Sequence, residues 1–137
     1  MLRTLTLLIA GATAVATVDL VQKALSISER DGAVFAHDRS AGYVAGIAVV
    51  AVVWAGIVSL TGSASISLTA GLVLGGAVGN LTSIALWPSV PGVPDPLVAG
   101  NIAFNLADVS VGLGVLLLVP TTLVYAVRNR ERLFEPA

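Results

Sequence analysis

The sequence predicts an all-α integral membrane protein in which four transmembrane helices form one bundle. The chain has 137 residues, of which 56% are hydrophobic and only 11% are charged, whereas soluble domains usually carry about 25% charged residues. Its apolar residues also gather into four runs, and a helix needs about 20 such residues to cross a membrane. A chain of this length is expected to form a single domain, residues 1–137.

The expected helices follow from these runs and from the breaks between them. The first spans about residues 5–25, and the second about residues 41–60, before the short polar segment TGSAS. The third spans about residues 66–87 and ends at the proline-rich segment 88–96, because proline lacks the amide hydrogen and clashes with the preceding helical turn. The fourth, about residues 98–127, is longer than one crossing, so its first turns are expected at the membrane interface or in a cavity.

The basic residues near the helix ends predict the orientation of the bundle. Arg3 and the three arginines of the C-terminal segment RNRERLFEPA fall on one side, whereas Lys23, Arg30 and Arg39 fall on the other. By the positive-inside rule, both termini are expected in the cytoplasm, and the 26–40 loop and the proline-rich loop are expected outside. The alternative is that MLRTLTLLIAGATAVA is a signal peptide, whose removal would leave three spans.

Composition also excludes several classes of function. The chain has no cysteine and one histidine, His37, which rules out disulfides and thiol catalysis and argues against a bound metal. No cofactor is expected. The net charge of −1 implies no bulk attraction to nucleic acid, so membrane lipids are the expected surroundings.

Polar residues within the fourth apolar run are the main sign of function. Asn101, Asn105, Asp108 and Gly112 recur at spacings of four, three and four, which places them on one stripe of a continuous helix. An ionisable carboxylate is costly in hydrocarbon, so the stripe should face the bundle or a wet cavity. The alternative is a polar seam that serves helix packing alone.

The first helix carries a second pair of charged residues. Asp19 and Lys23 are four residues apart, with the acid first, which is the favourable order for an ion pair within a helix. They either neutralise each other near the outer interface or support a site there.

The third helix combines small residues with one amide. Gly71, Gly75 and Gly79 recur every four residues and form a face that lets another helix approach closely. Asn80 follows and would be held against that partner, which could be the fourth helix.

Asp95 lies between two prolines in VPDPL and is either a solvated loop residue or the partner of Asp108. A loop that returns to the membrane could bring the two carboxylates together. Two close carboxylates share a proton, and such a pair can supply a general base and a general acid to hydrolysis.

Three segments resemble motifs of the lipoprotein signal peptidases, or signal peptidase II. These segments are DLVQK (19–23), GGAVGNLTS (75–83) and FNLADVSVGLGVLLL (104–118). The resemblance implies a four-helix aspartic endopeptidase of the bacterial inner membrane that cleaves lipid-modified prolipoproteins. It implies that Asp95 and Asp108 are catalytic and that Asn105, Asn80, Asp19, Lys23 and Asn101 bind substrate or support the site.

The chain also departs from the family pattern. Ser83 and Ile84 stand where the third-helix motif has Asp-Arg, and Gln22 replaces a hydroxyl residue. Two further interpretations therefore remain: a catalytically inactive paralogue that acts as a membrane binding or assembly protein, and a proton or solute carrier built on Asp19 and Asp108.

Overall fold

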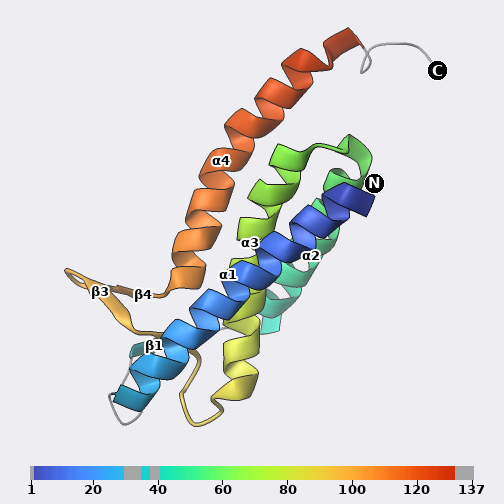
Figure 1. The fold of residues 1–137 in the computed structure, drawn as a ribbon. Helices are drawn as coiled ribbons and strands as arrows, with labels where there is room; N and C mark the ends of the chain where they lie inside the picture. The colour runs from blue at the N-terminus through green and yellow to red at the C-terminus, as the bar shows by residue number, and fades with distance from the viewer. Residues whose placement is uncertain (1, 30–34, 38–40, 132–137) are drawn as a thin grey trace.

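Long helices and short strands make up the part of the chain that the structure describes. The computed structural model describes residues 2–29, 35–37 and 41–131. In chain order, its elements are α1 (Leu2–Glu29), β1 (Phe35–His37), α2 (Ala41–Thr61), α3 (Ala64–Leu86), β2 (Val93–Asp95), β3 (Leu97–Ala99), β4 (Ile102–Phe104) and α4 (Leu106–Arg128) (Figure 1).

Helices α1, α3 and α4 are long and apolar enough to cross a membrane, as judged from the described residues. Many large apolar side chains of these helices point outward, such as Leu116 and Val119 of α4, which are 69% and 70% exposed. An outward apolar surface of this kind is what lipid contact requires. The expectation of helices long and apolar enough to span a membrane is therefore confirmed for these three elements.

Helix α3 lies between α1 and α4 and packs against both (Figure 1). The N-terminal end of α1 and the C-terminal end of α4 lie at one end of the molecule, and the strands lie at the other (Figure 1). The segments expected to form the two outer loops are thus together, because β1 and β2 come from them and pair with each other.

Glycines on two faces of α3 allow this close packing. A Cβ atom added at Gly75 would lie 2.6 Å from the carbonyl oxygen of Ala12 in α1, and one at Gly76 would lie 2.5 Å from that of Ala107 in α4. The face made by Gly71, Gly75 and Gly79 therefore packs on α1 and not on α4, and the neighbouring Gly76 meets α4.

The sequence did not predict the strands. Strand β1 pairs antiparallel with β2, with Phe35 opposite Asp95 and His37 opposite Val93, and β3 forms a hairpin with β4. Gly100 in the hairpin turn has a φ of 60°, a conformation that glycine adopts without a steric penalty. Helix α4 consequently begins at Leu106, and not near Val98 as expected.

Candidate functional site

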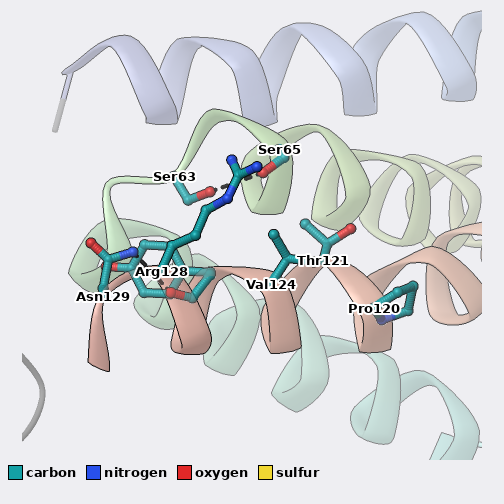
Figure 2. A pocket seen from close by; sticks show the side chains of 8 residues that line it. Ser63, Ser65, Pro120, Thr121, Val124, Arg128 and Asn129 are labelled. Atoms are coloured by element: carbon teal, nitrogen blue, oxygen red, sulfur yellow. Dashed lines mark hydrogen bonds between the residues drawn. The ribbon is translucent and has the colours of Figure 1, made fainter. Parts of the chain in front are cut away.

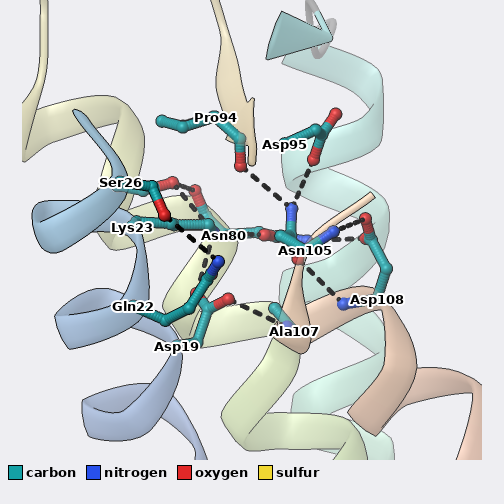
Figure 3. Close-up of polar contacts among 11 residues, drawn as sticks. Asp19, Gln22, Lys23, Ser26, Asn80, Pro94, Asp95, Asn105, Ala107 and Asp108 are labelled. Atoms are coloured by element: carbon teal, nitrogen blue, oxygen red, sulfur yellow. Dashed lines mark hydrogen bonds and ion pairs between the residues drawn. The ribbon is translucent and has the colours of Figure 1, made fainter. Parts of the chain in front are cut away.

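Six polar residues from α1, α3, β2 and the start of α4 meet at the strand end of the bundle. We refer to them as the polar cluster (Figure 3). Five are at most 2% exposed, and the sixth, Asp108, is partly exposed. Its members are Asp19, Lys23, Asn80, Asp95, Asn105 and Asp108.

Lys23 is completely buried and has three polar neighbours. Its Nζ atom lies 2.8 Å from Asp19 Oδ2, and it donates hydrogen bonds to Asn80 Oδ1 at 2.8 Å and to Ser83 Oγ at 3.5 Å. A buried ammonium group is tolerated only when it is paired and hydrogen-bonded in this way. The predicted ion pair between Asp19 and Lys23 therefore forms, and it joins α1 to α3.

Asp19 also joins α1 to α4. Its Oδ1 atom accepts a hydrogen bond of 2.9 Å from the backbone amide of Ala107 in the first turn of α4. The unpaired amides of a helix N-terminus favour a carboxylate at this position. Asp19 thus fixes the place at which α4 begins relative to α1.

Asn105 explains why α4 begins where it does. It is the N-cap of the helix: its Oδ1 atom accepts a 2.9 Å hydrogen bond from the amide of Asp108. In return, the Asn105 amide donates to Asp108 Oδ2 at 3.3 Å. This reciprocal capping box satisfies two amides that the helix would otherwise leave unpaired.

The side chain of Asn105 also reaches the second acid. Its Nδ2 atom donates to Asp95 Oδ1 at 2.5 Å and to the carbonyl oxygen of Pro94 at 3.3 Å. Asp95 is completely buried, so it is not the solvated loop residue that the sequence left as an alternative. Asn105 is therefore bonded to both Asp95 and Asp108 (Figure 3).

Asn80 links the acids to the buried lysine. Its Oδ1 atom accepts from Lys23, and its Nδ2 atom donates to Asp108 Oδ1 at 3.1 Å. Donor and acceptor are thus both used, which sets the orientation of the amide. Asp108 faces α3 across this bond, as its cost in hydrocarbon predicts.

Asn101 does not join the polar cluster. It lies in the exposed turn between β3 and β4, so the expected helical stripe from Asn101 to Gly112 is wrong at its first member. The spacing argument assumed a continuous helix, but the chain is a hairpin up to Phe104 and becomes helical only after Asn105. Gly112, on the helix, would have nothing within 4 Å of an added Cβ atom.

Two contacts of the site were not predicted. Nδ1 of His37 in β1 contacts Asp95 Oδ2, and Ser83, one turn beyond Asn80, contacts Lys23. Strands of three residues give too short an alternation to be read from sequence. The spacing of Asn80 and Ser83 on one helix face was the only available signal for the serine.

The polar cluster has the groups for acid–base hydrolysis. Both carboxylates accept from Asn105, Asp95 from its side-chain amide and Asp108 from its backbone amide. Carboxylates at close range can share a proton, because ionising both is unfavourable. One can then accept a proton while the other donates one. Within the described residues, no group of three or more metal-ligating side chains is found.

An apolar groove of about 410 Å³ leads to the polar cluster between α2, α3 and α4. Asn80 lines the groove and belongs to the polar cluster, and aliphatic or aromatic side chains form most of the remainder. A substrate segment in this groove would therefore have apolar surroundings next to the acids. Its lining includes Tyr43, Ile47, Val50, Trp54, Val73, Leu74, Val111 and Val115.

Another hollow, of about 440 Å³, lies at the opposite end of the molecule beside Arg128 (Figure 2). Ser63, Ser65 and Thr121 provide its hydroxyl groups, and Tyr125 Oη donates to the carbonyl oxygen of Thr61 at 2.8 Å. None of the residues that line it is a carboxylate or a histidine, so it offers no acid–base pair. The polar cluster is the better candidate for catalysis.

Comparison with known families gives one clear match. The model of the signal peptidase (SPase) II family matches residues 9–124, a range that contains the whole polar cluster. The chain has no match among curated proteins or among solved structures.

Proposed function

Because this chain belongs to the signal peptidase II family, we propose that it is an intramembrane aspartic endopeptidase. Its proposed reaction removes signal peptides from diacylglyceryl-modified prolipoproteins. Family membership and the apolar helices indicate a multi-pass membrane protein. The proposed catalytic residues are Asp95 and Asp108.

The observation that carries this proposal is the position of Asn105 between the two acids. One side chain donates to Asp95 through Nδ2 and accepts from the Asp108 amide through Oδ1. Asp95 ends a strand and Asp108 lies in the first turn of α4, and the hairpin between them, with Leu97 opposite Phe104, returns the chain to the place where Asp95 lies. The Asn105 backbone amide also donates to Asp108 Oδ2, so one residue orders both carboxylates, as a proton-sharing pair needs.

The proposed reaction is proton transfer without a covalent intermediate. The ionised carboxylate takes a proton from a water molecule as its oxygen attacks the scissile carbonyl carbon. The protonated carboxylic acid donates to the carbonyl oxygen, which becomes a hydroxyl in the tetrahedral intermediate. The C–N bond then breaks as a proton passes to the leaving nitrogen, and the pair again holds one proton.

The other members of the polar cluster are proposed to support the acids. Lys23, Asp19 and Asn80 join three helices through buried bonds, and Asn80 directly orients Asp108. The two acids must be held in place within fractions of an ångström, because misplacement of a catalytic group by about 1 Å can lower the reaction rate roughly 100-fold. Asn101 has no such bond to the acids, and its proposed contribution is limited to the exposed hairpin.

The apolar groove is consistent with a lipid-modified substrate. Asn80 lines both the groove and the polar cluster, so an apolar segment in the groove would place an adjoining peptide bond near Asp108. Such a segment stays in apolar surroundings while the peptide bond reaches the polar groups.

For the whole chain, we propose four membrane-spanning helices with both termini in the cytoplasm of a bacterium. This arrangement places the polar cluster at the outer face of the inner membrane. The arginines beside the two chain ends support this orientation. Membrane lipids and the prolipoprotein are the proposed partners, and no cofactor enters the reaction.

The decisive experiment is cleavage of a diacylglyceryl-modified prolipoprotein by purified protein in detergent. The wild type should release the signal peptide, and Asp95→Asn and Asp108→Asn should each lower the rate by at least about 100-fold. The double variant should be little worse than either single one, since residues that act as a unit are not additive. Full activity of Asp95→Asn would remove Asp95 from the catalytic pair and make Asp19 the next acid to test.

A second candidate function is that of an inactive paralogue that binds or assembles membrane proteins. The observation in its favour is that Ser83 and Ile84 replace the Asp-Arg of the family motif. In the structure, Ser83 donates to the carbonyl oxygen of Asn80 at 2.8 Å and leaves the two acids in place. If the wild type fails to cleave any prolipoprotein of its host, this second function replaces the first.

A further inference from the structure

The hollow beside Arg128 takes no part in the proposed hydrolysis, because it lies at the end of the molecule opposite the polar cluster. Its volume of about 440 Å³ is within the range of about 300–1,000 Å³ that is typical of small-molecule sites. The start of α3 forms one wall through Ser63 and Ser65, and the last turns of α4 form the other through Thr121, Val124 and Arg128 (Figure 2). Both helices are long and apolar enough to cross a membrane, and the ends of such helices lie at the level of the lipid headgroups.

Arg128 brings a positive charge into this hollow. Its side chain extends from α4 toward Ser63 and Ser65 (Figure 2). Among the residues that the structure describes, no ion pair joins Arg128 to an acid, and the lining of the hollow contains no carboxylate. A guanidinium group is a permanent cation with five N–H donors in a planar fork, which matches the oxygens of a phosphate group. The hollow therefore has the charge that an anion requires.

A pair of serines adds a hydrogen-bond donor. Ser63 Oγ accepts from the amide of Ile66 at 3.4 Å as the N-cap of α3, and it lies 3.1 Å from Ser65 Oγ. When Ser63 donates in this second contact, both functions of its hydroxyl are in use. The hydroxyl hydrogen of Ser65 is then available to another acceptor. Ser63 thus acts as the cap, and Ser65 is the serine that can donate to a ligand.

The other polar side chains of the hollow can be sorted in the same way. Asn129 Nδ2 donates one hydrogen to the carbonyl oxygen of Tyr125 at 2.8 Å and has a second hydrogen to donate. Thr121 adds no donor, because its hydroxyl already donates to the carbonyl oxygen of Leu117 at 2.6 Å. Arg128, Ser65 and Asn129 are therefore the side chains that can donate to an anion in the hollow.

An apolar stripe on α4 continues from the hollow toward the middle of the bundle. Pro120 and Val124 line the hollow, and Leu117 and Leu113 follow at spacings of three and four, which keeps them on the same face of the helix. Val124, Leu117 and Leu113 are each about half exposed. A ligand that covers both the hollow and this stripe needs an anionic head and an apolar tail.

We propose that the hollow binds the phosphate group of an anionic phospholipid, held by Arg128, Ser65 and Asn129, with an acyl chain along the α4 stripe. Inorganic phosphate has the same anion chemistry, but it has no part that the apolar stripe would contact. The inference goes beyond the proposed function, because the lipid is bound far from the polar cluster and is not cleaved. In the proposed orientation the hollow faces the inner leaflet, whose anionic lipids attract basic residues.

The first test measures binding to the full-length protein in detergent, by native mass spectrometry and by the temperature of unfolding. Dioctanoyl phosphatidylglycerol should bind the wild type and raise this temperature, because a ligand of the folded state stabilises it. Dioctanoylglycerol has the same chains without phosphate and should bind at least about 10-fold more weakly. Equal binding of the two would overturn the role of the phosphate. Inorganic phosphate that stabilises the protein as much at the same concentration would overturn the lipid as its source.

Two arginines at this end of the molecule provide matched variants. Arg128→Gln should weaken phosphatidylglycerol binding by about 10-fold or more, because it removes both the charge and the planar fork. Arg128→Lys keeps the charge without the fork and should recover only part of the affinity. Arg130→Gln is the control, because Arg130 is exposed and does not line the hollow. At physiological salt, which screens exposed charges, this control should change the affinity by less than about twofold.

Equal losses in Arg128→Gln and Arg130→Gln would show attraction by general positive charge and would overturn the site. Wild-type affinity in Arg128→Gln would overturn it as well. Arg128 is exposed, so its variants are expected to fold, and the temperature of unfolding without lipid checks this. Ser65→Ala leaves both arginines in place and should weaken binding by about threefold to 10-fold, which keeps the site testable if Arg128→Gln does not fold. These measurements need no cleavage, so they hold whether or not the protein is an endopeptidase.

Discussion

Asn105 combines a structural and a proposed functional role in one side chain. As N-cap it starts α4 through its Oδ1 atom, and through Nδ2 it donates to Asp95. An aspartate at this position would repel both acids, and a serine is too short to bond in two directions. An asparagine has the donor and the acceptor that the two bonds require.

Replacing Asn105 with alanine should therefore have two separable effects. Loss of the cap should lower the free energy of unfolding by about 0.5–2 kcal/mol, and loss of the bonds to the acids should lower cleavage by about 100-fold or more. Thermal unfolding in detergent and prolipoprotein cleavage measure the two effects.

The matched control is Ser63→Ala, which removes the N-cap of α3. Ser63 lies at the opposite end of the molecule, by the hollow beside Arg128 (Figure 2). The Ser63→Ala variant should lose about as much free energy of unfolding as Asn105→Ala and still cleave prolipoprotein at the wild-type rate. Equal activity losses in the two variants would show that Asn105 acts through stability alone.

The residue scale also shows what a sequence can predict of this site. Asp19 and Lys23 could be paired from their spacing, because both lie on one uninterrupted helix. Asn105 and Asp108 could be predicted as candidate site residues, but their relation as a capping box depends on where α4 begins. The contact of His37 with Asp95 depends on pairing between segments far apart in the chain, and no local pattern reports that.

At the scale of elements, the two glycine faces of α3 set the distances between helices. Gly75 meets the backbone of α1, and Gly76 meets the backbone of α4 at Ala107. The amide of Ala107 is bonded to Asp19, so the spacing of α3 and α4 bears directly on the polar cluster. The glycines in the sequence predict that α3 packs closely on another helix, but only the contacts between helices show which helix each glycine meets.

The variant Gly76→Ala tests this dependence. Its new Cβ would lie 2.5 Å from the carbonyl oxygen of Ala107, so the first turn of α4 must move, at a cost of about 1–3 kcal/mol. Cleavage should fall together with the temperature of unfolding. Gly112→Ala on α4 is the control, because nothing lies within 4 Å of its added Cβ.

The control should keep its activity and gain up to about 1 kcal/mol, since alanine favours a helix more than glycine does. A Gly76→Ala variant that cleaves at the wild-type rate would contradict the link between helix spacing and the site. The start of α4 was predicted less well than the glycine faces, because the hairpin of residues 97–104 is as apolar as the helix that follows it.

At the scale of the whole molecule, the polar cluster is separated from the N-terminal end of α1 and the C-terminal end of α4. The strands and the polar cluster lie at one end of the helices, and the ends of α1 and α4 lie at the other (Figure 1). The end without the polar cluster carries the basic residues Arg3, Arg128 and Arg130. The molecule is thus polarised along the direction in which it is proposed to cross the membrane.

This polarity predicts the accessibility of single cysteines, which is easily read because the chain has none of its own. Ser89→Cys, in the exposed turn before β2, should react with a membrane-impermeant thiol reagent added outside intact cells. Glu131→Cys, beyond α4, should react only after the membrane is permeabilised. Gly92 is a poorer site in the same loop, because its φ of 111° would be strained by a side chain. The reverse pattern would invert the proposed orientation.

The order of the elements along the chain has a consequence for biogenesis. Lys23 and Asp19 lie in the first helix to be synthesised, and they can neutralise each other there at once because they share one helix face. Asp95 and Asp108 follow α3 and emerge from the ribosome late. A nascent chain therefore contains α1, α2 and α3 while it still lacks both proposed catalytic acids. Proteolytic capacity would arise only when α4 docks, so an unfinished chain poses no threat to the membrane proteins made beside it.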